Sequence, residues 1–242
     1  MNFAHHALPN VLEAQQLRRS FGTTIALDAV DLSVAPGEAL AIMGPSGSGK
    51  STLLHALAGI ETPDAGSVML QLPGRTPVDI TTLSDTARSA LRRESFGFVF
   101  QDGLLIPELT AQENVAMALM INGVPRAAAL PRAVQALGQL GLGGMEERRI
   151  GQLSGGQAQR VAIARAQIGS AAVIFADEPT GALDSVTGSE VLDALLGSTI
   201  RQGKSLVMVT HDESVAARCD RIVRLRDGRI VADERSNQGE RS

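Results

Sequence analysis

The chain has 242 residues, a formal net charge of −4 and 44% hydrophobic residues, which predicts a globular fold and excludes a disordered chain. The acidic balance, with six Phe and neither Trp nor Tyr, argues against nucleic acid as the main partner. We expect no signal peptide, and the single Cys219 indicates a reducing compartment. No apolar run approaches the length of about 18 residues that a membrane-spanning helix needs, so we expect any membrane contact to pass through a partner.

The N-terminal part of the chain predicts strands around one helix. Residues 11–34 alternate short apolar runs with turns, which indicates a small antiparallel β layer. An apolar run at 39–43 predicts a buried strand, and a helical pattern follows from Leu53. The further elements expected here are a strand at 67–70, a helix at 84–94 capped by Ser84, and a buried strand at 96–100.

From Pro107 the pattern becomes helical. Thr110 and Glu113 form a capping box, a second helix is expected at 126–140, and a third begins at Ser154. Strand patterns then return. The remaining expected elements are strands at 171–176 and 205–210, a crossover helix at 186–200 capped by Ser185, and a hairpin at 222–232 with an Asp227–Gly228 turn.

These elements predict an α/β fold, namely a P-loop NTPase with a RecA-like parallel core, an antiparallel β layer and an inserted α-helical subdomain. We expect one domain over residues 11–242. Its core and β layer comprise 11–106 and 169–233, its helical subdomain comprises 107–168, and the flexible ends are 1–10 and 234–242.

The clearest motif lies between the strand at 39–43 and the helix that follows it. It matches G-x-x-x-x-G-K-[ST] in the strand, loop and helix context of a phosphate-binding loop. Glycines let the backbone bend around an anion, the lysine contacts β- and γ-phosphates, and the following hydroxyl binds Mg²⁺. The residues of this expected nucleotide site are Gly44, Pro45, Ser46, Gly47, Ser48, Gly49, Lys50, Ser51 and Thr52.

Two carboxylates follow the apolar strand at 171–176. Asp177 and Glu178 stand at the carboxyl end of a predicted parallel strand, where α/β folds place their ligands. Adjacent residues of an extended chain point to different sides, so the two have different roles. Asp177 suits the Mg²⁺ shell, and Glu178 suits orienting or deprotonating an attacking water.

A second anion-binding helix terminus is expected at Ser154, Gly155, Gly156 and Gln157. The Ser154 hydroxyl caps the helix, whose first residues are small and leave N–H groups exposed. Such a cap is common and carries little weight alone.

With both motifs in one chain, the sequence resembles the nucleotide-binding subunit of an ABC transporter from Val11 to about Val231. GPSGSGKST is similar to the family's Walker A motif, LSGGQ to its signature, and residues 173–178 to its Walker B motif. Gln101 stands at the Q-loop, Asp184 in Ala182-Leu183-Asp184 at the D-loop, and His211 at the switch histidine. All of them follow the family's order and spacing.

The resemblance implies a head-to-tail homodimer with ATP and Mg²⁺. Each ATP would lie between Walker A of one subunit and LSGGQ of the other, with Asp184 among the implied nucleotide-binding residues. Glu178, His211, Gln101 and Lys50 are the implied catalytic residues, and Ser51, Gln101 and Asp177 the implied metal-binding residues. His211 would contact the γ-phosphate.

Some positions depart from the family pattern. The family usually stacks a Tyr on adenine, and Phe21 is the candidate here, with a core role as its alternative. Ile150 replaces a frequent proline, and Gly181 replaces the serine that opens the S-x-L-D loop. Neither change removes a reacting group.

Within the family, residues 96–101, 104–107 and 109–115 look most like the MacB/LolD/FtsE branch. The resemblance implies attachment to an integral-membrane permease at the cytoplasmic face of the membrane, with residues 104–115 as the expected receiving segment and a core role for the apolar residues 104–106 as the alternative.

One alternative function remains open, and three others fit the sequence less well. An FtsE-like regulatory ATPase would carry the same motifs. Repair ATPases have long coiled coils between the P-loop and the signature, translation factors have two cassettes, and a P-loop kinase has no use for LSGGQ.

Overall fold

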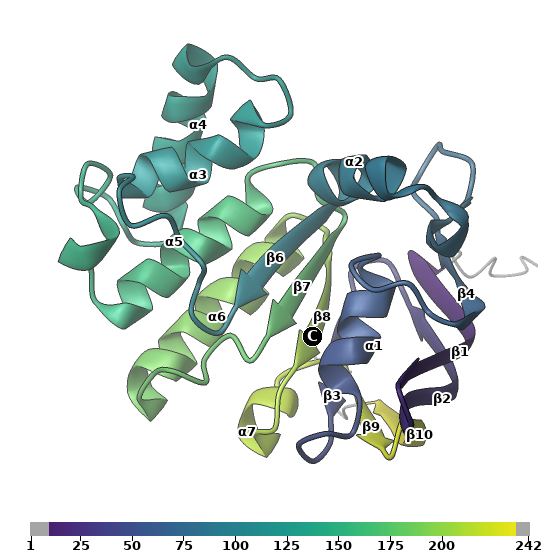
Figure 1. Cartoon of the computed structure of the whole chain (residues 1–242). Coiled ribbons are helices and arrows are strands. Elements are labelled where there is room, and N and C mark those ends of the chain that lie inside the picture. Colours follow the sequence, from purple (N-terminus) through teal and green to yellow (C-terminus); the bar gives the residue numbers. More distant parts are fainter. Residues whose placement is uncertain (1–9, 236–242) are drawn as a thin grey trace, which may run out of the picture.

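The computed structural model describes residues 10–235, and the larger of its two sheets has six strands in the order β10-β9-β3-β8-β7-β6 (Figure 1). All neighbouring strands pair in parallel except β9 and β10. The strands are β3 (Ala39–Met43), β6 (Phe96–Phe100), β7 (Val173–Asp177), β8 (Ser205–Val209), β9 (Arg221–Arg226) and β10 (Arg229–Arg235). This arrangement brings the carboxyl ends of β3, β6, β7 and β8 to one edge, where the predicted motifs begin.

The smaller sheet is antiparallel and has the order β2-β1-β4-β5. Its strands are β1 (Leu12–Phe21), β2 (Thr24–Val34), β4 (Ala65–Leu70) and β5 (Val78–Asp79). The first helix, α1 (Lys50–Leu57), lies between the two sheets and buries Leu53, Leu54 and Leu57. The expected antiparallel layer therefore holds α1 against the parallel core.

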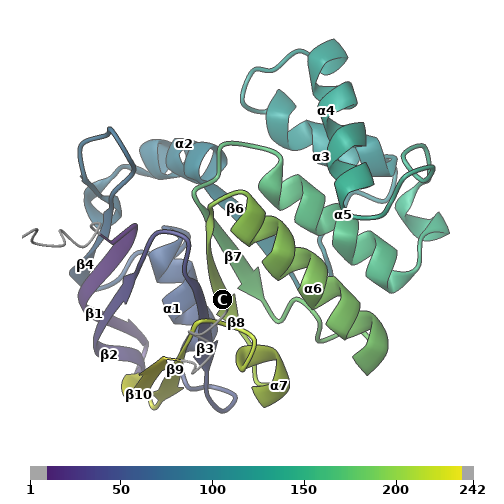
Figure 2. The ribbon, with the colours of Figure 1, turned by 180° about the vertical axis from the view of Figure 1, so that it is seen from behind.

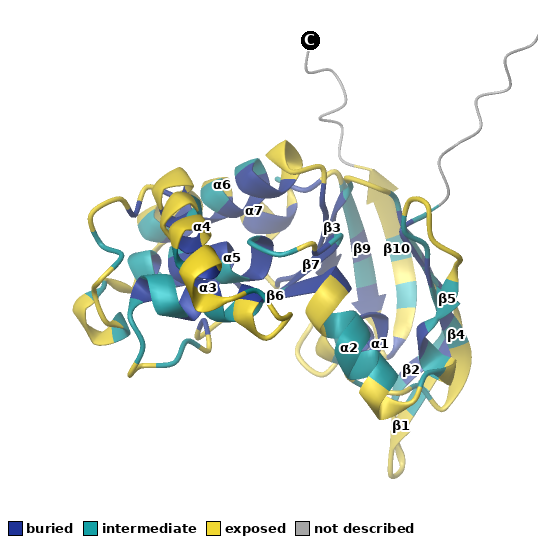
Figure 3. Cartoon of the chain, turned by 90° about the horizontal axis from the view of Figure 1, so that it is seen from above, coloured by how far each residue is buried: buried dark blue, intermediate teal, exposed yellow. Residues whose placement is uncertain are grey.

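The six-stranded sheet is buried on both faces, as the continuous apolar runs in its strands predict. In β3, Leu40 and Ile42 join the core cluster that contains α1 and the antiparallel sheet, whereas Ala39, Ala41 and Met43 join the cluster on the opposite face. Figure 3 shows β3 and β7 in the buried colour. The sheet thus separates two layers of helices.

The helices of the opposite layer come mainly from residues 107–168. They are α3 (Ala111–Met120), α4 (Arg126–Gln139), the short η2 (Ile150–Gln152) and α5 (Gly155–Gln167), and α6 (Ser185–Arg201) joins them from the core. Figures 1 and 2 show α3, α4 and α5 at the end of the molecule farthest from the antiparallel strands. The other helices are η1 (Ile80–Thr82), α2 (Asp85–Ser95) and α7 (Glu213–Ala216).

None of the helices in the described part of the chain has the length and apolarity needed to cross a bilayer.

Two details differ from the sequence-based expectations. The cap of α6 is Asp184 and not Ser185, because Asp184 Oδ1 accepts hydrogen bonds from the N–H groups of Val186 (3.1 Å) and Thr187 (3.0 Å). Strand β10 runs on through Glu234 and Arg235, whose partners lie in β9, so the expected flexible end does not begin at 234. The rest of the expected flexible ends, residues 1–9 and 236–242, lies outside the described residues.

Candidate functional site

The predicted phosphate-binding loop joins β3 to α1 at the carboxyl edge of the sheet. Its backbone packs so tightly on neighbouring strands that glycine is required at two positions. A Cβ at Gly44 would lie 2.1 Å from Leu225 O, and one at Gly49 would lie 2.2 Å from Ala26 O. Gly49 also has φ of +101°, which other residues rarely adopt. The neighbouring strands therefore fix the shape of the loop.

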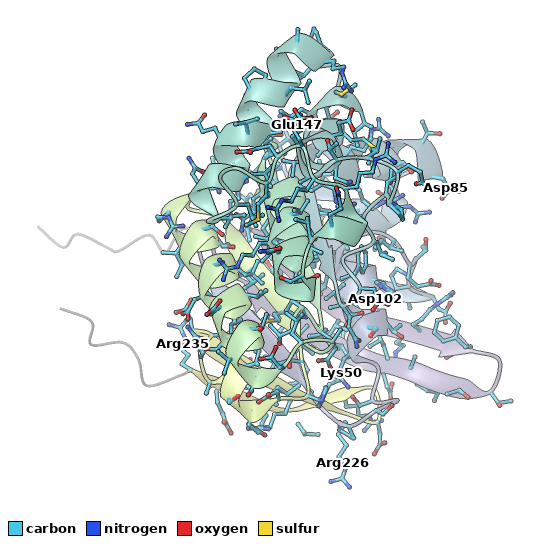
Figure 4. The ribbon with its side chains drawn as sticks, turned by 90° about the vertical axis from the view of Figure 1, so that its left-hand side faces the viewer. Lys50, Asp85, Asp102, Glu147, Arg226 and Arg235 are labelled. Atoms are coloured by element: carbon cyan, nitrogen blue, oxygen red, sulfur yellow. The ribbon has the colours of Figure 1, made fainter. Side chains whose placement is uncertain are left out.

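Lys50 and the N-terminus of α1 give this loop its positive character. Lys50 Nζ donates to Gly44 O (2.8 Å) and Pro45 O (2.9 Å), so the ammonium group spans the loop that it belongs to. Gly49 provides no side-chain cap and the first turn of α1 contains no acidic residue, so its N–H groups are available to an anion. The buried Ser48 Oγ also has no hydrogen-bond partner. Figure 4 shows Lys50 in the lower part of the molecule, away from Glu147 in the helical part.

The structure brings Ser51 and Asp177 together. Asp177, the last residue of β7, is half-buried, and this burial raises the pKa of its carboxyl group, while a hydrogen bond from the Ser51 side chain opposes the shift. A hydroxyl and a carboxylate are the hard oxygen ligands that Mg²⁺ takes together with substrate phosphates. Residues 10–235 contain no cluster of three or more His, Cys, Asp or Glu side chains that suits a metal ion.

Glu178 and His211 form a pair beside this site. His211 Nδ1 lies 2.8 Å from Glu178 Oε1, and the hydrogen bond raises the pKa of the imidazole. Glu178 has φ of +47°, a left-handed conformation that is unfavourable for a residue with a side chain. The contacts Glu178 N to Val209 O (2.9 Å) and Gly181 N to Glu178 O (3.0 Å) hold it there. The neighbouring structure thus positions the carboxylate that we predict to activate water.

Gln101 reaches the same place from β6. It directly follows Phe100, which pairs with Asp177 of β7. A Cβ at Gly181 would lie 3.3 Å from Gln101 Cδ and Nε2 and 3.5 Å from Glu178 Cβ, so Gln101 and Glu178 flank the same glycine. Because Gly181 replaces the serine of the S-x-L-D pattern, no side chain at position 181 crowds the amide group of Gln101.

The second predicted anion site lies at the N-terminus of α5, which we call the signature helix. Ser154 Oγ accepts from Gln157 N (3.3 Å), and Gln157 Oε1 accepts from Ser154 N (3.0 Å), a complete capping box. A Cβ at Gly156 would lie 2.3 Å from Thr187 Cγ2, so glycine lets this helix approach α6 closely.

The structure does not bring the two predicted anion sites together within one chain. The loop at 44–52 opens α1 on one face of the six-stranded sheet, and the signature helix packs on the other face. Among residues 10–235, no hydrogen bond joins Ser154–Gln157 to that loop. One chain therefore presents two separate half-sites.

Phe21 lies at the end of β1 and is 49% exposed. This exposure disfavours the core role that the sequence left open. The guanidinium carbon of Arg19 lies 4.8 Å from the ring centroid, so Arg19 covers part of the ring. Stacking on adenine stays a prediction.

Gln159 and Arg165 were missed by the sequence analysis. Both project from the signature helix and bond main-chain carbonyls of the Q-loop segment, Gln159 to Phe100 and Arg165 to Gly103 and Leu104. Helical periodicity places polar residues at the surface, so no sequence pattern identifies a buried glutamine such as Gln159 as a partner of these loops.

Known proteins that are similar to this chain belong to the family that the motifs indicate. Residues 27–181 match the family model described as ABC transporter. The macrolide export ATP-binding/permease protein MacB of Rhodopseudomonas palustris (strain HaA2) is 48% identical over 93% of this chain and 34% of its own length. The pyoverdine export ATP-binding/permease protein PvdT of Pseudomonas entomophila (strain L48) is 45% identical over 94% of this chain and 35% of its own length. The chain spans about a third of the length of the curated relatives it matches.

A solved structure agrees over nearly the whole chain. The dimeric post-hydrolysis state of the ATP-binding cassette MJ0796, bound to ADP and Pi, is 37% identical, with a TM-score of 0.81 over 93% of this chain and 98% of that chain. The fold class predicted from the sequence is thereby confirmed.

Proposed function

This chain belongs to the ABC transporter family and to its MacB-like branch, and from that premise we propose that two copies close head to tail on two ATP molecules to drive a membrane permease. The observation that carries the proposal is the separation of the two half-sites on opposite faces of the sheet. Because a γ-phosphate at Lys50 is not reached by Ser154 of the same chain, the signature helix must come from a second copy. The ATP-binding cassette MJ0796 is a dimer in its post-hydrolysis state with ADP and Pi, which supports dimerisation.

In the proposed reaction the loop at 44–52 and Lys50 hold the β- and γ-phosphates. Ser51, Asp177 and Gln101 would hold Mg²⁺, which when bound neutralises charge on the phosphates. The Gly155 and Gly156 N–H groups and the Ser154 hydroxyl of the opposite copy bind the γ-phosphate from its other side. Phe21 stacks on adenine, and Asp184 borders the interface.

The Glu178–His211 pair leads us to expect slow turnover in a single copy. His211 Nδ1 occupies one carboxylate oxygen of Glu178. A γ-phosphate oxygen offers His211 a stronger acceptor, and the released Glu178 then accepts a proton from the attacking water. ATP binding thus prepares the base for hydrolysis.

The permease is proposed from the relatives, which are named ATP-binding/permease proteins. We place the receiving surface on the groove of about 340 Å³ between α2, β6, α3 and the signature helix. Arg92, Arg93 and Arg165 line it, so it suits a permease segment with apolar and acidic side chains. No residue of the expected segment 104–115 lines this groove, and Leu104 adjoins it through the bond from Arg165. Leu104 is 60% exposed, which favours a docking role for it, whereas Leu105 packs against the core as the alternative predicts. The complex would lie at the cytoplasmic face, and the relatives' names favour export over an FtsE-like signalling role.

The substitution Glu178→Gln tests the enzymatic part of the proposal. Removal of the proton acceptor should lower ATP turnover by at least about 100-fold while ATP binding persists, because general-base catalysis supplies about that factor. Light scattering should then detect an ATP-dependent dimer. Glu190→Gln, on the exposed side of α6, is the matched control. Turnover of Glu178→Gln equal to that of the control would remove Glu178 from the reaction.

A further inference from the structure

Gln159 is a buried amide placed between two functional loops. It lies on the signature helix, is 4% exposed, and its Nε2 donates to Phe100 O and to Pro179 O, both at 2.8 Å. A glutamine amide has two N–H donors, so both are used. The two acceptors belong to different segments, one at the end of β6 and one just after β7. A single side chain therefore ties these segments to one helix.

Each segment carries a residue of the proposed reaction. Phe100 immediately precedes Gln101, and Pro179 immediately follows Glu178. The Gln101 and Glu178 side chains converge on Gly181, as its surroundings show. A shift of either segment therefore changes the position of Gln101 relative to Glu178.

The backbone at this point needs support. Glu178 has φ of +47° and is restrained through its own N–H and C=O groups. Gln159 restrains the next residue in the chain through Pro179 O. Unfavourable backbone conformations persist only where the surrounding structure holds them, and the Gln159 amide is part of that structure.

Arg165 holds the other end of the Q-loop segment to the same helix. Its guanidinium donates to Gly103 O (2.7 Å) and Leu104 O (2.8 Å), and Leu104 has φ of +45°. The segment from Phe100 to Leu104 is therefore bound to the signature helix at both ends. Ser154, which would contact the opposite nucleotide, caps the same helix.

We propose that Gln159 is a positioning residue for ATP hydrolysis, because its amide fixes the loops of Gln101 and Glu178 to the helix that contacts the other ATP. The inference rests on the proposed function. Both donors of the Gln159 amide bond the main chain of these two loops, so Gln159 acts through the positions of Gln101 and Glu178. Its loss should therefore affect turnover and not ATP binding.

The test compares Gln159→Met with Gln167→Met in the full chain. Methionine keeps the length of the side chain and removes both donors. Gln167 is a matched control, since it lies on the same helix, is also 4% exposed and donates to Thr199 Oγ1 (2.9 Å), away from the loops. The measurements are kcat and KM for ATP, the Kd for radiolabelled ATP by equilibrium dialysis, and hydrogen exchange by mass spectrometry.

We expect Gln159→Met to lower kcat by about 10-fold or more, since small displacements of reacting groups have effects of this size, and to leave the Kd for ATP within about threefold of the control. Hydrogen exchange should accelerate in peptides covering 100–104 and 177–182 and not elsewhere. A kcat equal to that of Gln167→Met would overturn the proposal, and so would faster exchange throughout the chain or lost ATP binding. If the unmodified chain hydrolyses no ATP, the proposed function itself fails.

Discussion

At the scale of single residues, the contact between Glu178 and His211 affects the protonation of the imidazole. The hydrogen bond that His211 donates to Glu178 raises the pKa of His211, whose side chain is otherwise well exposed to solvent. The protonated imidazole donates to the carboxylate, so the pair is strongest when His211 is charged. Its contribution to folding is complete below the ordinary pKa of about 6.5 and is lost as the pH rises through the higher folded value.

The contact predicts that the pKa of His211 depends on the charge of Glu178. In Glu178→Gln, the pKa of His211 should fall, because the charged hydrogen-bond partner is gone. Titration of the imidazole Cε1–H signal by NMR measures this value. Glu190→Gln, which removes a remote carboxylate, should leave the signal unchanged. An identical His211 titration in both variants would contradict the contact.

Residues with a motif were predictable, and residues that act through packing were not. The roles of Lys50, Asp177 and Glu178 were predictable because phosphate binding, Mg²⁺ binding and activation of water require those residue types in those positions. The positions of Gln159 and Arg165 depend on how the signature helix packs against β6 and β7, which local sequence does not encode. The cap of α6 was misplaced by one residue because Asp184 and Ser185 are both good capping residues.

At the scale of elements, the capping box of α3 is the clearest local structure. Glu113 accepts from Arg126 and from the backbone of Thr110, and these bonds lower the pKa of Glu113 to about 2. A lowered carboxyl pKa stabilises the fold above the ordinary value of 4.5, and this stabilisation is lost as the pH falls toward about 2. The start of α3 is thus sensitive to acid.

The substitution Glu113→Gln should lower the free energy of unfolding by about 0.5 kcal/mol near neutral pH, the size of a partly exposed ion pair. Glutamine also completes a capping box, so the loss reports the charge. Urea denaturation at several pH values measures it, and the difference from the unmodified chain should shrink toward pH 2. Glu108→Gln is the control for charge alone. A pH-independent difference would contradict the assignment.

The proposed permease groove is tested at Ile121, which lines it and is 56% exposed. Ile121→Glu should reduce copurification with the permease by about 10-fold or more, because a charge would be buried at the interface. Ile200→Glu, at a similarly exposed position on α6, is the matched control. Equal copurification of the two variants would place the permease elsewhere.

Element types were largely predictable where a strand or long helix has a clear hydrophobic pattern. The two-residue strand β5 and the short helices η1, η2 and α7 have no such pattern and were not expected. The continuous apolar runs of β3, β7 and β8 indicated strands buried on both faces, as observed. The predicted end of strand β10 was too early, because Glu234 and Arg235 are polar and suggest a frayed tail. Their main-chain pairing with β9 does not depend on apolar side chains.

At the scale of the whole molecule, the central claim is that an active site contains parts of two chains. The variants Lys50→Ala and Ser154→Arg damage different half-sites, and each should be nearly inactive alone. When they are mixed, a heterodimer contains one site with both defects and one intact site. Because half of the dimers in an equal mixture are mixed, activity should return to about a quarter of the unmodified level if the sites act independently.

This complementation assay is the most direct test of the account. ATP hydrolysis is measured for each variant and for the equal mixture at one total protein concentration. The head-to-tail arrangement predicts recovery in the mixture well above the sum of the two variants. A mixture that remains as inactive as its components would contradict it.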